Sequence, residues 1–434
     1  MNKHSTAKVK ANLSQSIEKI NSAKKMYVQQ PGKDFTRKQK LPFDEMIRII
    51  LSMEGNSLPQ ELMKFFEYSP VSATSSAFCQ QRSKLKYDAF HDLFVDFTST
   101  FHSPKTYKGY RLLAADGSEI YIPRNESDTD TYINNGTDKK GWNKLHLNAL
   151  YDLQNRIFTD AIITPGKKVA EQTSLLTMIQ TLQNKHKSII IADRGYESYQ
   201  LFYDFIEQDI PFLIRIKSEK GNSFLSSVSL PSTNDFDIQM SIRVASRNNR
   251  SSLKGIEKKF VDPKTLSCIT PENNIYVYKV RIIKIQLSDN NYEYLLSNLP
   301  DTTFPTKDIK ELYNMRWGIE TAFRELKYAL GLLNFHSKKV ESIKQEIFAK
   351  LIMYNFCSMI TSHIIITQCP TNKHIYQLNF TRALDICKQY FLHKMYPPNV
   401  EACIMKHILP VRKGRSYSRK MQKNKPMSFL YRVS

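Results

Sequence analysis

The sequence contains no apolar run of about 18 residues, the length that a membrane-spanning helix requires. The N-terminal stretch MNKHSTAKVKANLSQ also has no apolar segment of the kind that directs secretion. The 6 cysteines are scattered and form no CxxC pair, so they predict neither a zinc site nor a disulfide framework. The 13 glycines are spread thinly and form no phosphate-binding loop. We therefore expect a cytoplasmic protein that does not act at a membrane.

Acidic residues are also few in comparison with basic ones. The 434 residues include 63 Lys and Arg against 41 Asp and Glu, which gives a formal net charge of +22. An excess of this size predicts a polyanionic partner, above all nucleic acid. Hydrophobic residues make up 41% of the chain, and its length is sufficient for two to four folded units.

Residues 43–101 have apolar side chains at spacings of three and four, which predicts a series of helices. The segment SSAFCQQRSKLKYDAF adds a basic cluster made of Arg82, Lys84 and Lys86. Two short helices followed by a basic one are compatible with a DNA reader of the helix-turn-helix kind. An ordinary helical cap over the rest of the protein is the alternative.

The pattern then changes to alternating and fully apolar segments. RLLAADGSEIYI (111–122), KLHLNALYDL (144–153) and RIFTDAIITPG (156–166) predict three consecutive antiparallel strands. A helix over 171–185, a strand over 188–196, a second helix and a strand over 211–217 are expected next. This order predicts a mixed α/β domain. Residues 218–304 are polar and turn-rich, with two strands near their end, so we interpret them as a β-rich insertion.

The stretch YNMRWGIETAFRELK (313–327) predicts a helix with two distinct faces. Because a helix turns about 100° per residue, Tyr313, Arg316, Glu320 and Lys327 should project from the same side. A second stripe is apolar and should be buried; it contains Ile319, Phe323, Leu326, Leu330 and Leu333. The polar side would then present a hydroxyl, a guanidinium, a carboxylate and an ammonium group along one line.

Two further carboxylates follow apolar strand segments. Asp116 precedes Gly117 in the first predicted strand, and Asp193 follows the buried segment SIIIA. Acids at such positions point into a crevice at the edge of a sheet. Together with Glu320 they can hold two divalent cations about 3.5–4 Å apart for in-line attack on a phosphodiester, and Mg²⁺ needs only one or two carboxylates per ion. Asp152 and Asp160 are alternative acids on the same predicted sheet.

These motifs resemble the DDE transposases of bacterial insertion sequences, within the insertion-sequence-four family. The resemblance rests on AADGSEI around Asp116, ADRGY around Asp193 and the spacing Tyr313-x2-Arg316-x3-Glu320-x6-Lys327, supported by SSAFCQQRSKL. It implies a ribonuclease-H-like mixed sheet flanked by helices, with a β-rich insertion and helical N- and C-terminal regions. The expected organisation is a basic, DNA-end-binding region (1–105), a catalytic core in two parts (106–217 and 305–360) separated by the insertion (218–304), and a C-terminal helical region with a basic tail (361–434).

The resemblance also implies roles for individual residues. Asp116, Asp193 and Glu320 would be the catalytic ligands of two Mg²⁺ ions, for which Mn²⁺ could substitute. Tyr313, Arg316 and Lys327 would grip the terminal 5′-phosphate region of the DNA. The further DNA-binding candidates are Arg324, Arg82, Lys84 and Lys86. The implied partner is double-stranded DNA, both transposon end and target, bound by a homodimer near the bacterial nucleoid.

The family's chemistry is cut-and-paste transposition through a hairpin on the transposon end. Hairpin formation requires a base to leave the stack, and an aromatic platform helps to hold it. The insertion contains no tryptophan, since the only two are Trp142 and Trp317. The remaining aromatic candidates are Tyr276, Tyr278, Tyr292, Tyr294 and Phe260. A non-catalytic DNA-binding protein derived from a transposase and a structure-specific nuclease are alternative functions.

Overall fold

The computed structural model describes most of the chain between residues 5 and 411. Within that range the description omits 38–39, 103–104, 135, 137–139, 168–170, 219–222, 227, 247–258, 263–264, 271–272, 289–290, 369–370, 372 and 393–398. The predicted basic tail beyond residue 411 therefore lies outside the described residues.

The chain begins with helices and then builds a sheet. The N-terminal helices are α1 (Thr6–Ser22), α2 (Phe43–Ser52), α3 (Leu58–Phe65), α4 (Ser75–Arg82) and α5 (Asp88–Ser99). The next elements are β1 (Arg111–Ile122), β2 (Tyr132–Ile133), β3 (Trp142–Asp152), β4 (Ile157–Pro165), α6 (Glu171–Gln180), β5 (Ser188–Ala192), α7 (Tyr199–Glu207) and β6 (Phe212–Ile216). The insertion supplies β7 (Phe236–Ser246), β8 (Lys259–Val261), β9 (Ile275–Ser288) and β10 (Asn291–Ser297).

The C-terminal part returns to helices. It contains α8 (Thr306–Met315), α9 (Trp317–Tyr328), α10 (Val340–Thr361), β11 (Ile375–Leu378), α11 (Phe380–Leu392), α12 (Val400–Met405) and β12 (Ile408–Val411). β11 and β12 pair in an antiparallel two-stranded sheet, which the sequence did not predict for this helical region. Among the described residues, no helix is both long enough and apolar enough to cross a membrane.

The sheet has the strand order expected of a ribonuclease-H-like core. β3 pairs antiparallel with both β1 and β4, while β1, β5 and β6 are parallel neighbours. The order β4-β3-β1-β5-β6, with its first three strands antiparallel, confirms the predicted mixed α/β fold. The strands of the insertion extend the same sheet, because β10 pairs antiparallel with β6 and is followed by β9, β7 and β8.

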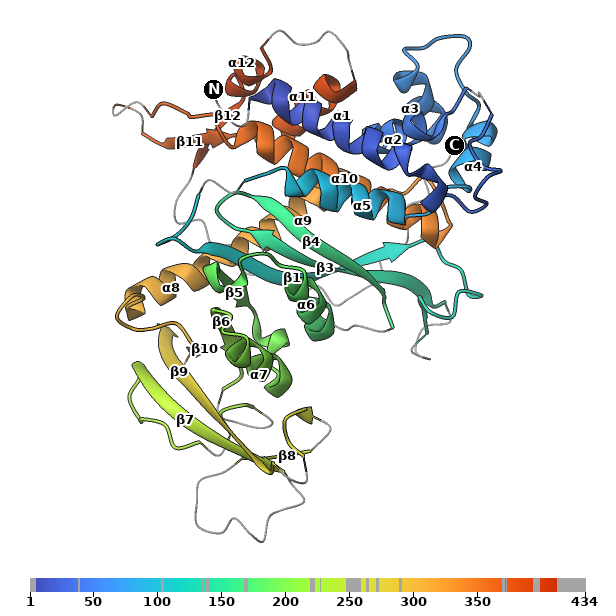
Figure 1. The fold of residues 1–434 in the computed structure, drawn as a ribbon. Coiled ribbons are helices and arrows are strands. Elements are labelled where there is room, and N and C mark those ends of the chain that lie inside the picture. The colour runs from blue at the N-terminus through green and yellow to red at the C-terminus, as the bar shows by residue number, and fades with distance from the viewer. Residues whose placement is uncertain are drawn as a thin grey trace.

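Helices cover the two faces of the core sheet unequally. On one face, α1, α2, α5 and α10 form a thick helical layer over β1, β3 and β4 (Figure 1). On the other face, α6 and α7 pack against a separate apolar cluster that also takes in residues of the insertion. α8 and α9 run along the side of the sheet near β1 and β5 (Figure 1). The N-terminal helices therefore join the main core as a cap over the sheet.

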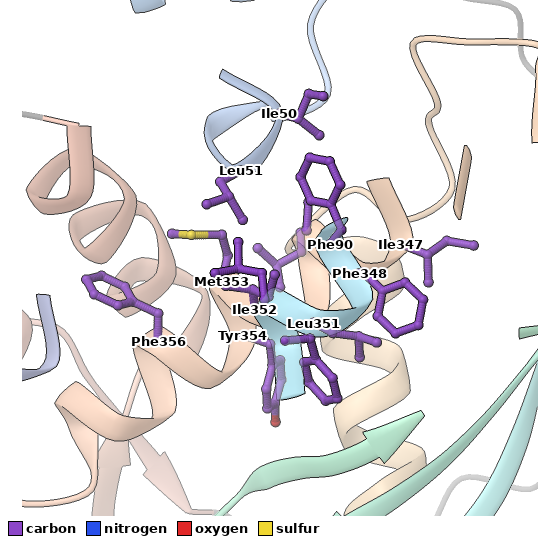
Figure 2. Packing of buried hydrophobic residues seen from close by; sticks show 14 of the residues in the cluster. Ile50, Leu51, Phe90, Ile347, Phe348, Leu351, Ile352, Met353, Tyr354 and Phe356 are labelled. Carbon is purple, nitrogen blue, oxygen red and sulfur yellow. The ribbon is translucent and has the colours of Figure 1, made fainter. Parts of the chain in front are cut away.

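Helix α10 is the centre of the helical layer. Its residues from Ser342 to Ile360 are buried almost without interruption, as expected for a helix surrounded by protein on all sides. Figure 2 shows Phe348, Leu351 and Ile352 of α10 packed with Phe90 of α5 and with apolar residues of α2. The predicted helical pattern over this segment is thus confirmed as an interior helix.

Three predicted elements differ in detail from the structure. The strand predicted over 188–196 ends at Ala192, and a 3-10 turn (Arg194–Tyr196) follows Asp193. The helix predicted over 171–185 ends at Gln180. The helix predicted through 313–327 is broken at Arg316, where the backbone N–H of Arg316 donates to the carbonyl of Tyr313, three residues back. Such i→i+3 bonds tighten the turn and end regular α-helical geometry.

Candidate active site

The two aspartates occupy matching positions on neighbouring parallel strands. β1 and β5 pair with Ala115 opposite Ala192, so Asp116 and Asp193 are the next residues on each strand. Neighbouring strands lie about 4.8 Å apart, which brings the two backbones close together. β5 ends at Ala192 while β1 continues to Ile122. Asp116 is therefore inside β1, and its side chain lies at the level where the adjacent strand stops.

The pKa of Asp116 depends on burial and on the charged groups around it. Burial is the main reason that the pKa of Asp116 is raised, and the negative charges of Asp193 and Glu320 raise it further, to about 7. The backbone N–H of Gly117, which donates to Oδ1 at 2.9 Å, and the positive charge of Arg316 act in the opposite direction. Asp116, Asp193, Glu320 and Arg316 thus lie within one electrostatic neighbourhood. The structure places the three predicted acids together.

Arg316 sits at the junction of α8 and α9 and contacts Glu320. Its Nη2 donates to Oε1 of Glu320 at 2.9 Å, and the guanidinium lies over the rings of Tyr313 and Trp317, 5.7 and 4.9 Å from their centroids. Tyr313 is buried, and burial together with charges that include Asp193 raises the pKa of its hydroxyl. The hydroxyl of Tyr313 has no hydrogen-bond partner among the described residues. Tyr313, Arg316 and Glu320 thus lie on both sides of the helix break and near the aspartates.

Lys327 lies near the C-terminal end of α9, on the same helix as Glu320. Burial lowers the pKa of its ammonium group, and the nearby negative charges of Glu119 and Asp116 partly offset that effect. Lys327 thus lies near Asp116, one of the three acids, from the far end of α9. Arg324 is exposed on the same helix. The opposite face of α9 is buried as predicted at Ile319, Phe323, Leu326 and Leu330, whereas Leu332 rather than Leu333 is the buried residue at its end.

The predicted basic cluster of the N-terminal region is not uniform. Arg82 is only 3% exposed. Its guanidinium forms an ion pair with Glu346 at 2.9 Å and donates to Gln345 Oε1 and to the carbonyl of Ser342. Lys84 and Lys86 are partly exposed. The structure therefore buries Arg82 against α10, away from a position where DNA could reach it.

The alternative acids have other surroundings. Asp152 is fully buried and accepts hydrogen bonds from Arg111 and from Asn155. Asp160 accepts from the backbone N–H of Ala161 and from Thr181. Asp152 pairs across from Leu113, three residues before Asp116 on β1, and Asp160 lies on β4, which is separated from β1 by β3. Their hydrogen bonds indicate structural roles.

The aromatic residues of the insertion also differ in accessibility. Tyr278 and Tyr294 are buried. Tyr276 donates to Glu207 at 2.7 Å, and Tyr292 donates to Asn234 at 3.0 Å while Lys284 lies over its ring. By contrast, Trp317 is 47% exposed beside Arg316.

Three residues that the sequence analysis did not single out lie beside the aspartates. Glu171 opens α6, and its Oε1 is 3.0 Å from Nε2 of His146 on β3. Tyr196 is buried, and burial, followed by the charges of Glu171, Asp116 and Asp193, raises the pKa of its hydroxyl. The one available sequence signal was an acid opening a helix directly after the third strand. That signal carries little weight until the neighbouring strands are known.

The described residues contain no group of three His, Cys, Asp or Glu side chains that is already arranged to hold a metal ion. The donor set nevertheless fits a hard divalent cation, because it consists of carboxylates and Mg²⁺ takes much of its coordination from water and phosphate oxygens. Two of these carboxylates, those of Asp193 and Glu320, lie near enough to Asp116 to raise its pKa beyond the larger effect of burial.

The chain matches the model of a known protein family. The family described as the transposase DDE domain matches residues 107–356, which is more than half of the chain. The chain therefore belongs to the family of transposase DDE domains. The matched segment contains β1, β5 and α9, so it includes Asp116, Asp193 and Glu320. The resemblance predicted from the sequence motifs is confirmed.

Individual relatives match over much shorter stretches. The transposase InsG of insertion sequence element IS4 from Escherichia coli (strain K12) is 37% identical over 65 residues, 14% of this chain and 15% of that protein. The putative transposase InsL of element IS186A from the same organism is 33% identical over 75 residues, 17% of this chain and 20% of that protein. The chain thus aligns with no more than a fifth of either relative. A transposase chain in a solved synaptic complex of piggyBac transposase with hairpin DNA is structurally similar, with a TM-score of 0.48 and 10% sequence identity. The match covers 97% of this chain and 88% of that chain.

Proposed function

We propose that this protein is an active DNA transposase of an insertion sequence, with Asp116, Asp193 and Glu320 as its catalytic triad. The observation that carries the proposal is the meeting of three acids from separate elements beside a helix face of Tyr, Arg and Lys. A protein that only binds DNA would have no need for three carboxylates gathered in one place. Membership of the transposase DDE-domain family supports the same conclusion.

The three carboxylates would hold two Mg²⁺ ions, or Mn²⁺ in their place. When bound, such ions lower the pKa of an attacking water or 3′-hydroxyl and stabilise the leaving oxygen. The protein itself fixes two of the acids on paired strands, so their separation is set by the backbone of the sheet. Glu320 is on a helix, forms an ion pair with Arg316, and lies near enough to Asp116 to act on its pKa.

The DNA-binding role falls to the residues of α8 and α9. Arg316 suits a bidentate grip on a phosphate, and Lys327 suits a point contact. We propose that Tyr313, Arg316 and Lys327 hold the DNA end next to the triad, that Arg324 contacts the backbone from the exposed side, and that Lys84 and Lys86 add contacts from the N-terminal region. Arg82 is better assigned to stabilising the fold, because its guanidinium is already satisfied inside the protein. Arg316 is almost as little exposed, at 5%, but its Nε has no hydrogen-bond partner among the described residues.

The proposed reaction is cut-and-paste. Water would free a 3′-hydroxyl at the transposon end, and that hydroxyl would attack the opposite strand to close a hairpin. A second water would open the hairpin, after which the 3′-hydroxyl would join the target DNA. Two ends must be paired in this reaction, so we propose a homodimer on DNA. The net charge of +22 supports binding to transposon ends and target DNA alike.

The decisive experiment compares wild-type protein with Glu320→Gln on a marker flanked by the DNA that borders the gene. Excision, hairpin formation and strand transfer would be followed on denaturing gels in Mg²⁺. We expect Glu320→Gln to lose more than about 100-fold in rate, because even residues that only support metal ligands are worth about 10- to 100-fold. DNA-end binding by gel shift should persist. The matched control is Glu311→Gln, which changes an exposed carboxylate on α8.

Strand transfer by Glu320→Gln at the wild-type rate would refute the catalytic assignment. End binding without any cleavage by the wild-type protein would favour a non-catalytic DNA-binding function instead. Cleavage of branched DNA with no preference for the bordering sequences would favour a structure-specific nuclease.

A further inference from the structure

A fourth carboxylate, that of Glu171, lies close to both Gly117 and Gly195, the glycines that follow the two aspartates. A methyl group added at Gly117 would overlap the ring of His146 and would lie 2.7 Å from Oε1 of Glu171. A methyl group added at Gly195 would lie 3.0 Å from Oδ1 of Asp193 and 3.3 Å from Oε2 of Glu171. The glycine after Asp116 and the glycine two residues after Asp193 therefore face the same carboxylate. A side chain at Gly117 would clash with Glu171 and His146, and one at Gly195 would be crowded by Glu171 and Asp193.

The two oxygens of Glu171 have different neighbours. Oε1 faces Nε2 of His146 at 3.0 Å, although the ring is not oriented to form a hydrogen bond. Oε2 faces the backbone of Gly195 on the side where Oδ1 of Asp193 also lies. His146 can thus engage one oxygen of Glu171 and leave the other directed toward Asp193.

Two buried polar groups beside Glu171 point independently to a polar ligand. His146 is 5% exposed, and neither of its ring nitrogens has a hydrogen-bond partner among the described residues. Tyr196 is 1% exposed, and its hydroxyl likewise has no partner there. Buried polar groups are normally satisfied, and exceptions cluster where a water, an ion or a catalytic group is bound. Both exceptions adjoin the carboxylate that lies between Gly117 and Gly195.

We propose that Glu171 is a fourth carboxylate of the divalent-cation site, acting beside Asp193. This inference rests on the proposed function, since it adds a ligand to the same site. It differs from the three-acid arrangement in drawing one donor from α6, on the face of the sheet opposite the helical layer. The competing explanation is that Glu171 is only an ion-pair partner that stabilises His146.

Binding of Mn²⁺ to the full-length protein without DNA separates these explanations. Free Mn²⁺ would be measured by its electron paramagnetic resonance signal during titration of wild type, Glu171→Gln, Asp193→Asn and Glu311→Gln. We expect Glu171→Gln and Asp193→Asn each to weaken Mn²⁺ binding by about 10-fold or more, and Glu311→Gln to bind as wild type does. Glu171→Asp keeps the charge on a shorter side chain and should retain part of the affinity.

Thermal unfolding midpoints measured in EDTA and in Mn²⁺ distinguish the loss of a metal ligand from a folding defect. A ligand role predicts that Glu171→Gln melts in EDTA at or above the wild-type temperature, because a repulsive charge is removed, and that its stabilisation by Mn²⁺ is reduced. A lower midpoint in EDTA with unchanged Mn²⁺ affinity would overturn the inference. If Asp193→Asn weakens binding and Glu171→Gln does not, only the fourth ligand is refuted. If wild type and Asp193→Asn bind Mn²⁺ equally, the proposed metal site itself fails.

Discussion

Replacing Arg82 by Met tests whether this basic residue serves the fold or the DNA. Arg82 closes α4, and its buried guanidinium pairs with Glu346 at 2.9 Å, which ties the N-terminal region to α10. Burial alone would raise the pKa of Glu346, yet the charge of Arg82, a hydrogen bond from His336 and further nearby positive charge lower it to about 2. Glu346 therefore stays ionised in the interior, and it depends on Arg82 for much of its compensation.

The expected loss follows from the charge that would be left behind. Removing one partner of a buried ion pair costs about 3–5 kcal/mol, because the other charge remains buried without compensation. His336 and Lys350 still face Glu346, so we expect Arg82→Met to lie near the lower end of that range. The double variant Arg82→Met with Glu346→Gln should recover a large share of the loss, since it leaves no unpaired charge.

Urea unfolding followed by circular dichroism measures the loss, and gel shifts with the gene's bordering DNA measure end binding. The matched control is Lys84→Ala, whose partly exposed ammonium donates to Gln81. A surface change of this kind should alter the free energy of unfolding by less than about 0.5 kcal/mol. Arg82→Met with a stability within about 1 kcal/mol of wild type and no end binding would refute the reasoning. That result would restore Arg82 as a DNA contact.

Two further changes test other buried cations. Burial is the main reason that the pKa of Lys350 is lowered from 10.5 to about 7. Between pH 7 and 10.5 the unfolded state therefore binds more protons than the folded state. The free energy of unfolding should rise with pH in this range by up to about 1.4 kcal/mol per pH unit. Lys350→Met should flatten that rise in urea unfolding between pH 7 and 9, and an unchanged slope would contradict the lowered pKa. Arg281→Met should cost roughly 1–3 kcal/mol, because it removes the partner 2.6 Å from Asp237, whose side chain is 20% exposed and still accepts from Thr306. The exposed Arg243→Met on the same β7–β9 pair is its control, and equal losses in the two variants would sink the argument.

Periodicity in the sequence predicted the core elements because apolar alternation records which face of each strand is buried. β1, β3 and β4 lie where the pattern put them, and their antiparallel pairing is confirmed. The break between α8 and α9 could not be predicted in this way, because the residues around Arg316 keep helical spacing on both sides. The ends of β5 and α6 were missed for a related reason. Leu182 continues the apolar spacing after α6 has stopped, and Tyr196 is buried although the ladder of β5 ends four residues earlier.

The acids of the candidate site were visible in the sequence, but their surroundings were not. Asp116 and Asp193 follow apolar strand segments, a local signal, whereas the burial of Arg82 depends on Glu346, which is far away along the chain. Charge on a helix shows that a side chain needs a partner without showing whether that partner is DNA or another part of the protein. The same holds for Glu171, whose contacts come from two strands.

The glycines of the two aspartate motifs link these observations. Neither Gly117 nor Gly195 has a positive φ angle in the structure. Backbone conformation therefore does not require glycine at either position. At Gly117 close approach requires it, since a side chain there would collide with His146 and Glu171, and a side chain at Gly195 would crowd Asp193 and Glu171. One glycine lies on β1 and the other in the turn after β5, and both face Glu171, which explains why each stands beside an acid.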